Sequence, residues 1–316
     1  MLTLLSEELQ PDMNFAGGQW RIPSRRLLPD HERRRIAKVR FVYLVTVPIP
    51  QQAQAMSMTP ENIERAARIF DAARRDNCFV DEIPAELGLD NLEDAARVAE
   101  RVVALSGERV VGFLVGATSP EMQESLNIGE PYYACILESN LCRSPANLAS
   151  RNLLTIGLES EVAFTLGADL PARSAAYSHG EVTGAIRSIH GSVEVVNGHV
   201  RDWLGKPIAW VMADNGTDGP LVLGPAVERW HDIDRPDIPV TLTVNGEIVR
   251  EGRGGNALGD PLNVMVWLAN RRSREGKGMC AGDVVNTGTA AGIFFAEPGG
   301  EAVADFGPLG RVSLAF

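Results

Sequence analysis

The sequence predicts a mainly β chain of the α+β class, with a small helical portion ahead of a larger β domain. From residue 153 onward, short apolar runs alternate with turns rich in Gly, Pro, Asn and Asp, a pattern typical of successive strands. The Asn245-Gly246 pair separates two of these runs, as the tight turn of a hairpin would. Apolar residues at helical spacing occur mainly between residues 60 and 105. We therefore expect a small α/β portion over residues 56–145 and a β domain over residues 146–316.

Capping signals place the expected helices. Thr59-Pro60-Glu61 supplies a cap, a proline and an acid in the order that begins a helix, which should cover residues 60–76. A second helix is expected after Asn91, and a short one after Ser119. Between and after them, residues 109–116 and 131–137 are expected to form strands. One further amphipathic helix is predicted over residues 261–273.

Composition excludes some classes of partner. The 316 residues carry a formal net charge of −11, which argues against nucleic acid or an anionic membrane as the main partner. No apolar run approaches the roughly 18 to 20 residues that span a bilayer. The four cysteines show neither C-x-x-C pairing nor metal-ligand spacing, so a reduced, cytoplasmic setting is expected.

Residues 1–55 differ from the rest of the chain. Residues 21–40 hold eight basic and only two acidic residues, in a protein that is otherwise acidic. The basic cluster, the apolar run 41–49 and the small residues at 53–55 resemble the zones of a secretory signal, but the apolar zone is short and ends in proline. The preferred interpretation is that the functional chain starts at Met56 or Met58. Residues 1–55 would then be a disordered or non-native extension.

Two acids interrupt an apolar strand pattern at Gly157-Leu158-Glu159-Ser160-Glu161-Val162. Side chains two residues apart lie on one face of a strand, so Glu159 and Glu161 should project side by side. A third acid, Glu194, lies in a similar β-branched run. Three convergent carboxylates without a His or Cys motif suggest a hard divalent ion, Mg²⁺ or Mn²⁺. The alternative is that the alternation only marks an exposed sheet face.

Six motifs follow one another along residues 60–316. They are residues 112–119 (GFLVGATS) with Met122-Gln123, 159–164 (ESEVAF), 193–196 (VEVV), 213–215 (ADN), 258–263 (LGDPLN) with 267–270 (WLAN), and 281–289 (AGDVVNTGT). Taken together, they resemble the 2-keto-4-pentenoate hydratase and 4-oxalocrotonate decarboxylase group within the fumarylacetoacetate hydrolase superfamily.

This resemblance implies a fold, a cofactor and a reaction. The fold would be the mixed β roll of the fumarylacetoacetate hydrolase type, and Glu159, Glu161 and Glu194 would bind Mg²⁺. The leading function is hydration of a 2-hydroxy-2,4-dienoate in aromatic catabolism. Decarboxylation of a 2-oxo-3-enedioate and hydrolysis of an acylpyruvate are the alternatives. Asn215 and Thr289 would contact a small 2-keto acid substrate, and the enzyme would be a homo-oligomer.

The sequence departs from the family pattern at three positions. The lysine that the family carries between two glycines is Leu114 here, and leucine can neither hold a charge nor donate a hydrogen bond. An acid and an arginine that follow the third glutamate fall at Asn197 and His199. Because of these losses, the sequence assigns no acid-base residue. The alternative to an enzyme is therefore a catalytically weak, metal-binding paralogue or an assembly subunit.

Other polar residues are candidates to replace the missing groups. His190 and His199 lie near Glu194 in the sequence, and either could serve acid-base chemistry or be structural. The cations to examine are Arg143, Arg151 and Lys206.

Overall fold

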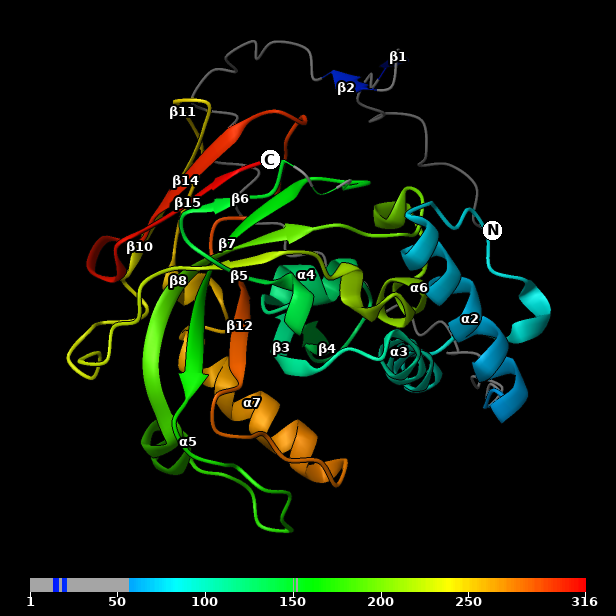
Figure 1. Cartoon of the computed structure of the whole chain (residues 1–316), viewed down its shortest axis with the longest axis horizontal. Coiled ribbons are helices and arrows are strands. Elements are labelled where there is room, and N and C mark those ends of the chain that lie inside the picture. The colour runs from blue at the N-terminus through cyan, green and yellow to red at the C-terminus, as the bar shows by residue number, and fades with distance from the viewer. Residues whose placement is uncertain (1–13, 17–18, 22–56, 150, 152) are drawn as a thin grey trace, which may run out of the picture. The chain divides into compact units, whose positions relative to one another are not determined.

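The computed structural model describes residues 14–16, 19–21, 57–149, 151 and 153–316 (Figure 1). The chain divides into two compact units, Met1–Ala53 and Gln54–Phe316. In the first unit, strand β1 (Asn14–Ala16) pairs antiparallel with β2 (Gln19–Arg21). The other residues of the predicted extension 1–55, and Met56, lie outside the described residues.

The second unit begins with the two predicted helices, α2 (Pro60–Asp76) and α3 (Leu92–Ser106). Thr59 Oγ1 accepts a hydrogen bond from the Asn62 amide at 3.2 Å, and Asn91 Oδ1 accepts one from the Asp94 amide at 2.9 Å. The apolar face of α2 is buried against α3, and α6 (Ile208–Ala213) completes this helical layer. Both helices therefore begin at the capping residues that the sequence predicts.

An eight-stranded sheet forms the centre of the second unit. Seven strands follow one another in the order β4-β3-β12-β7-β8-β9-β5, and β13 pairs with β7 beside them. Their bounds are β3 (Val110–Gly116), β4 (Tyr132–Leu137), β5 (Leu141–Arg143), β7 (Gly157–Leu166), β8 (Ile186–Val196), β9 (Leu221–Leu223), β12 (Val284–Thr289) and β13 (Phe294–Phe295). Strands β3 and β4 come from the predicted portion 56–145, yet β3 pairs in parallel with β12. The two portions predicted from the sequence thus contribute strands to one sheet. The domain boundary between residues 145 and 146 stays a prediction.

A five-stranded sheet packs against the eight-stranded one. Its order is β11-β10-β14-β15-β6, with the bounds β6 (Ala146–Asn147), β10 (Pro239–Val244), β11 (Glu247–Arg253), β14 (Glu301–Asp305) and β15 (Arg311–Ala315). The predicted hairpin is confirmed: β10 and β11 meet at Asn245 and Gly246, whose φ angles are 50° and 85°. The main hydrophobic core contains residues of both sheets and of α7 (Pro261–Arg274), which is the predicted C-terminal helix.

Several short helices complete the fold. The short helix predicted after Ser119 is α4 (Pro120–Ser125), whereas α5 (His179–Ala185) and α6 are helices that the sequence analysis did not predict. Helix α5 is held by a capping box between Ser178 and Glu181. The 3₁₀ turns are η1 (Ala85–Leu87), η2 (Glu138–Asn140), η3 (Trp203–Gly205), η4 (Asn215–Thr217), η5 (Gly254–Asn256) and η6 (Gly307–Leu309). In the described part of the chain, no helix has both the length and the apolar character that a bilayer span requires.

A buried ion-pair cluster fastens helix α2 to the turn η4. Arg74 Nε donates to Asp214 Oδ1 at 3.1 Å, Arg74 Nη2 donates to the Asp214 carbonyl at 2.6 Å, and the same nitrogen pairs with Asp218. Asp214 and Asp218 are buried, so they depend on this guanidinium for compensation. Although burial disfavours the charged form, Asp218 and Asp214 together raise the pKa of Arg74 above its ordinary value.

Candidate metal centre

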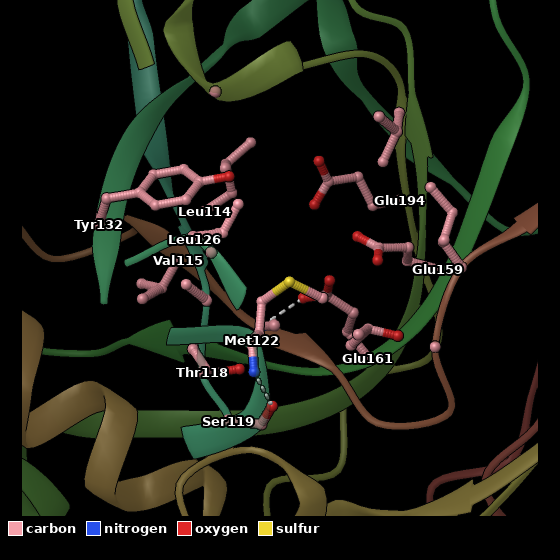
Figure 2. A pocket seen from close by; sticks show the side chains of 18 of the residues that line it. Leu114, Val115, Thr118, Ser119, Met122, Leu126, Tyr132, Glu159, Glu161 and Glu194 are labelled. Atoms are coloured by element: carbon pink, nitrogen blue, oxygen red, sulfur yellow. Dashed lines mark hydrogen bonds between the residues drawn. The ribbon is translucent and has the colours of Figure 1, made fainter. Parts of the chain in front are cut away.

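A cavity of about 740 Å³ opens between the strands of the central sheet and the short helices near it. Glu159, Glu161 and Glu194 lie on one side of it, and Leu114, Val115, Leu126 and Tyr132 lie on the other (Figure 2). The carboxylate side comes from β7 and β8, and the opposite side comes from β3, β4 and the segment after α4. Both of the portions predicted from the sequence therefore contribute walls to one cavity.

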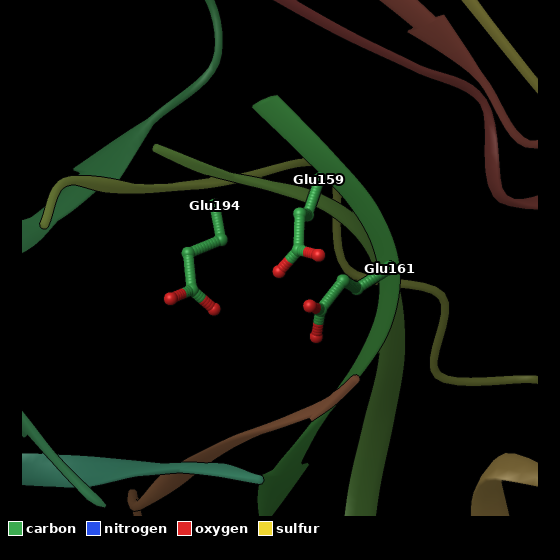
Figure 3. Close-up of side chains that lie close together, drawn as sticks. All are labelled: Glu159, Glu161 and Glu194. Carbon is green, nitrogen blue, oxygen red and sulfur yellow. The ribbon is translucent and has the colours of Figure 1, made fainter. Parts of the chain in front are cut away.

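The three glutamates converge because of strand period and register. Glu159 and Glu161 are two residues apart on β7, and Glu194 on β8 lies directly opposite Glu159 in the antiparallel pair. One carboxylate oxygen from each residue lies within 4.8 Å of the others (Figure 3). Glu161 and Glu194 are buried and Glu159 is half-buried. The structure thus brings the three together as predicted and excludes the exposed sheet face.

Burial and mutual repulsion disfavour ionisation of this cluster. Burial raises the pKa of Glu159 to about 7. Burial and the neighbouring Glu159 raise the pKa of Glu194 to about 8. For Glu161, burial and then the charges of Glu194 and Glu159 raise the pKa well above its ordinary value, although the Gly288 amide lowers it in part. Like charges directly opposite one another destabilise a sheet, so the cluster needs protons or a cation.

Strand β12 supplies the hydrogen bonds that orient two of the carboxylates. The Gly288 amide donates to Glu161 Oε2 at 2.6 Å, and Asn286 Nδ2 donates to Glu194 Oε2 at 3.0 Å. Asn286 Oδ1 in turn accepts from the Ser192 hydroxyl at 2.6 Å. The register of β12 against β7 shifts between Asn286 and Thr289, and Gly288 has φ +88°. A Cβ there would lie 2.0 Å from Thr118 Oγ1, so the irregularity that aims this amide requires glycine.

Replacing Asn286 with alanine should weaken metal binding. The substitution removes the donor that fixes Glu194, and the loss of such a supporting group typically costs about 10- to 100-fold in metal affinity. Titration of the metal-free protein with Mn²⁺ would measure the change. Asn62→Ala is the matched control, because the side-chain amide of Asn62 donates to the backbone carbonyls of Glu86 and Leu87 in the helical layer, outside the cavity lining. Equal Mn²⁺ affinity in both variants would contradict the assigned role of Asn286.

The donor set fits a hard divalent cation. The ligand atoms are carboxylate oxygens, which Mg²⁺ and Mn²⁺ prefer. Among the described residues, no Lys, Arg or His forms an ion pair with any of the three glutamates, and their hydrogen-bond donors are the neutral Gly288 amide and Asn286 side chain. The residues present therefore match a bound cation better than any internal salt bridge. Their role as metal ligands stays a prediction of the sequence analysis.

The wall that faces the carboxylates carries Leu114 and Tyr132. Leu114 is 6% exposed and lines the cavity at the position where the family carries lysine. Tyr132 lies opposite Gly116 in the β3–β4 pair, and a Cβ on Gly116 would lie 2.4 Å from Tyr132 Cζ. The phenol ring thus covers the bare glycine and presents its hydroxyl to the cavity (Figure 2). Burial and the three glutamates raise the pKa of Tyr132, so the phenol is protonated at neutral pH.

The two residues predicted to contact substrate differ in their surroundings. Thr289 lines the cavity, and its hydroxyl is buried without a hydrogen-bond partner in the described structure. Asn215 instead bonds to the backbone of β4: its Oδ1 accepts from the Cys135 amide at 2.9 Å, and its Nδ2 donates to the Cys135 carbonyl at 2.8 Å. These contacts favour a structural role for Asn215, which holds η4 so that Gly216 and Thr217 reach the cavity.

Thr289→Val should weaken substrate binding without destabilising the protein. The hydroxyl has no protein partner to lose, whereas a hydrogen bond to a charged ligand group contributes about 1.5–3 kcal/mol, which is roughly 10- to 100-fold in affinity. Affinity for oxalate in the presence of Mg²⁺, measured by calorimetry, tests the first half, and thermal melting tests the second. Thr289→Ser retains the hydroxyl and is the control. If Thr289→Val binds oxalate as tightly as the parent protein, Thr289 does not contact the ligand.

The polar residues that follow Glu194 serve the fold. Asn197 Oδ1 accepts from the amides of Leu154 and Thr155, at 2.8 and 3.2 Å. His199 is buried against Asp214, whose Oδ2 accepts from the His199 backbone amide at 2.7 Å. Neither side chain lines the cavity. The acid-base roles considered for this stretch therefore gain no support from the geometry.

His190 is a neutral structural histidine. Its Nδ1 faces the Gly224 carbonyl at 3.1 Å and must be the donor there. Its Nε2 then accepts from the hydroxyls of Thr165 and Ser188, at 2.9 and 3.0 Å. Burial lowers the pKa of His190 and maintains this neutral form.

The three cations singled out in the sequence are engaged elsewhere. Arg143 is exposed outside the cavity lining, and Arg151 Nη2 donates to the Ser139 carbonyl at 2.6 Å. Lys206 contributes to the lining, but its Nζ pairs with Glu82 Oε1 at 2.8 Å and donates to the Asp81 carbonyl at 3.0 Å. None of the three takes the place of the missing lysine among the described residues.

Comparison with known proteins identifies the family. A sequence model of the fumarylacetoacetate hydrolase C-terminal domain matches residues 138–314. The 2-keto-4-pentenoate hydratase of Paraburkholderia phymatum is 34% identical over 213 residues, which is 67% of this chain and 80% of that protein. The 2-keto-4-pentenoate hydratase 1 of Dechloromonas aromatica is 30% identical over 256 residues, which is 80% of this chain and 96% of the relative.

A solved structure shares the fold. It is the 4-oxalocrotonate decarboxylase from Pseudomonas putida G7 complexed with magnesium and adipate, with a TM-score of 0.75 and 22% identity, covering 82% of this chain and 99% of that chain. The predicted fold class and the resemblance stated from the motifs are both confirmed. Because the family match spans more than half of the sequence and curated relatives reach 34% identity, the chain belongs to the fumarylacetoacetate hydrolase family.

Proposed function

We propose that the protein is a Mg²⁺-dependent hydro-lyase that hydrates a 2-hydroxy-2,4-dienoate, or a close analogue, in the degradation of aromatic compounds. The observation that carries this proposal is the convergence of Glu159, Glu161 and Glu194 in a cavity where no described cation compensates them. The relatives named 2-keto-4-pentenoate hydratase support the reaction type. The magnesium in the solved decarboxylase of this fold agrees with the choice of ion.

In this proposal, Glu159, Glu161 and Glu194 would hold the ion, and Mn²⁺ would be an acceptable substitute. The bound ion would supply Lewis-acid stabilisation of the negative charge that develops on the keto oxygen of the substrate. The Thr289 hydroxyl, which lacks a protein partner, would donate to the same end of the substrate. Leu114 keeps the facing wall apolar and helps to exclude water from the reacting atoms.

Tyr132 is the side chain best placed to hold a proton near the substrate. Its hydroxyl faces the cavity, and its raised pKa keeps it protonated. It can therefore donate a hydrogen bond or a proton toward the carbon chain, but at neutral pH it does not act as a base. This assignment gives the cavity a proton donor in place of the absent lysine.

Leu114 favours a second candidate of another class, a metal-binding paralogue with weak activity. Steady-state assays with 2-hydroxypenta-2,4-dienoate and with 4-oxalocrotonate, each with Mg²⁺ and with EDTA, would separate the hydratase from the decarboxylase. An acylpyruvate in the same series tests the hydrolase reaction. Normal metal binding without turnover of any of these substrates would contradict the proposed hydratase and favour the paralogue.

Leu114→Lys distinguishes loss of activity from a change of substrate. A large gain in 2-hydroxypenta-2,4-dienoate turnover would mean that the parent protein has lost activity at this position. A parent that is active, combined with a variant that is no better, would mean that the pocket has been adapted to another substrate.

The same proposal extends to the setting of the enzyme. We infer a cytoplasmic homo-oligomer that acts on a small 2-keto acid. The four free cysteines, Cys78, Cys135, Cys142 and Cys280, are compatible with a reduced compartment. Light scattering after size-exclusion chromatography would test the assembly, and a monomeric mass at micromolar concentration would contradict it.

A further inference from the structure

The cavity is much larger than the proposed reaction requires. Cavities of about 300–1,000 Å³ typically enclose drug-sized ligands, and this one measures about 740 Å³. A pentenoate bound at the carboxylates would occupy only the end next to β7 and β8. The remaining space extends past Met122 toward Leu126 and Tyr132 (Figure 2).

The remaining space is lined mainly by apolar side chains. Val115 on β3, Leu126 after α4 and Met122 lie there (Figure 2), and Val211 on α6 and Leu204 also line the cavity. Met122 and Leu204 remain 45% and 68% exposed. Large apolar side chains exposed to solvent beside a binding cavity are typical of a surface that a ligand or another subunit covers.

The cavity offers no available cation to a second acidic group. Within the described structure, Lys206 is the one basic residue of the lining. Its ammonium group is paired with Glu82 and the Asp81 carbonyl, and it lies 5.2 Å from the centre of the Trp210 ring. The other charged residue outside the glutamate trio is Glu121, which is itself acidic. A carboxylate at the far end of a substrate would therefore have to compete with Glu82 for Lys206, or lose its hydration without gaining a partner.

We propose that the substrate is a monocarboxylic oxo or hydroxydienoic acid whose far end carries an uncharged apolar substituent, an alkyl chain or an aryl ring of several carbons. This inference rests on the proposed function, because the carboxylate end must bind at Glu159, Glu161 and Glu194. The apolar end lies against Val115, Leu126 and Met122. Such a substrate would derive from the ring cleavage of an aromatic compound that bears an apolar side chain, so a ring-opening reaction would lie upstream of it.

Binding of three saturated 2-oxo acids in the presence of Mg²⁺ tests the inference without turnover. 2-Oxooctanoate has four more methylenes than 2-oxobutanoate and should bind about 250-fold more tightly when all four are buried, since each buried methylene contributes about fourfold. 2-Oxooctanedioate, which has the same chain and a terminal carboxylate, should bind at least roughly tenfold more weakly than 2-oxooctanoate, because its second charge is desolvated without a partner.

The outcomes separate the two proposals. If the diacid binds as tightly as 2-oxooctanoate or more tightly, or if the longer chain adds no affinity, the proposed apolar substituent is wrong. The proposed binding of a 2-oxo acid at the metal would still hold. If none of the three acids binds in a Mg²⁺-dependent manner, the proposed function is wrong, and the proposal of an apolar substituent is wrong with it.

A positive charge placed beside the apolar region tests where the far end of the ligand lies. Met122→Lys introduces a cation at a side chain that is 45% exposed, so the fold should tolerate it. We expect this variant to bind 2-oxooctanedioate about tenfold more tightly and 2-oxooctanoate more weakly than the parent. Ile248→Lys is the matched control, because Ile248 is 63% exposed on β11 and lies outside the cavity lining. An unchanged ratio of the two affinities in Met122→Lys would contradict the placement of the far end beside Met122.

Discussion

Glu194→Gln is expected to lower kcat/KM by at least about 10³-fold while leaving the protein folded. A bound ion that stabilises charge on a substrate oxygen contributes several kcal/mol, and each 1.36 kcal/mol is tenfold in rate. Glutamine preserves the shape of Glu194 but removes one of the three carboxylates that we propose as metal ligands. Steady-state kinetics with saturating Mg²⁺, together with the metal content of the purified protein, would measure both effects.

The control for this variant is a glutamate outside the site. Glu297 is exposed and does not line the cavity, so Glu297→Gln should retain parental activity. In EDTA, Glu194→Gln should melt at or above the temperature of the parent, because it removes one of three like charges that lie close together. A variant that retains activity within about threefold of the parent, with normal metal content, would show that Glu194 is not a ligand.

Removal of the metal should make stability depend on pH. Without a cation, the folded-state pKa values of Glu159 and Glu194, about 7 and about 8, exceed the ordinary value of an unfolded glutamate. A group whose pKa is raised by folding stabilises the native state fully below its unfolded pKa. That contribution is lost as the pH rises through the folded pKa. The protein in EDTA should therefore lose stability between about pH 4.5 and pH 8, and change little above that range.

Mg²⁺ should reverse this loss, because it binds the ionised carboxylates. At 100 times its dissociation constant, a ligand of the native state contributes about 2.7 kcal/mol, which corresponds to a rise of roughly 5 °C in Tm. The rise should be largest at pH 8–9 and small at pH 6, where protons compete with the ion. Melting curves with MgCl₂, with EDTA, and with NaCl at equal ionic strength would test this. Identical pH profiles with and without Mg²⁺ would contradict a metal site at these residues.

Local sequence patterns predict part of the glutamate site. The two-residue spacing of Glu159 and Glu161 in a strand pattern predicts that they share a face, and the structure confirms it. No local signal places Glu194 opposite Glu159, because strand register depends on contacts across the sheet. The sequence offered Glu194 only as a third acid in a similar β-branched run, and the resemblance added support for its place beside the other two. Helix α5 was missed because it is shorter than the stretch over which helical periodicity becomes visible.

Other features of the cavity depend on tertiary contacts that the sequence does not encode locally. Tyr132 and Tyr133 are adjacent in one predicted strand, and only the pairing of Tyr132 with Gly116 determines which ring covers the glycine beside the cavity. Asn286 is an asparagine within a β-branched strand, without a local sign that its amide supports Glu194. Asn215 lies in a motif that the family places near substrate, but its side chain completes the hydrogen bonds of Cys135.

The ion pairs between Arg74 and the two aspartates Asp214 and Asp218 have a consequence for where the enzyme can be shortened. A fragment limited to residues 138–314, the region matched by the family model, would retain Glu159, Glu161 and Glu194. It would lose Leu114 and Tyr132, and the guanidinium that neutralises the two buried aspartates beside Gly216 and Thr217 would be absent. The smallest autonomous catalyst in this chain therefore includes helix α2, even though no residue of that helix lines the cavity.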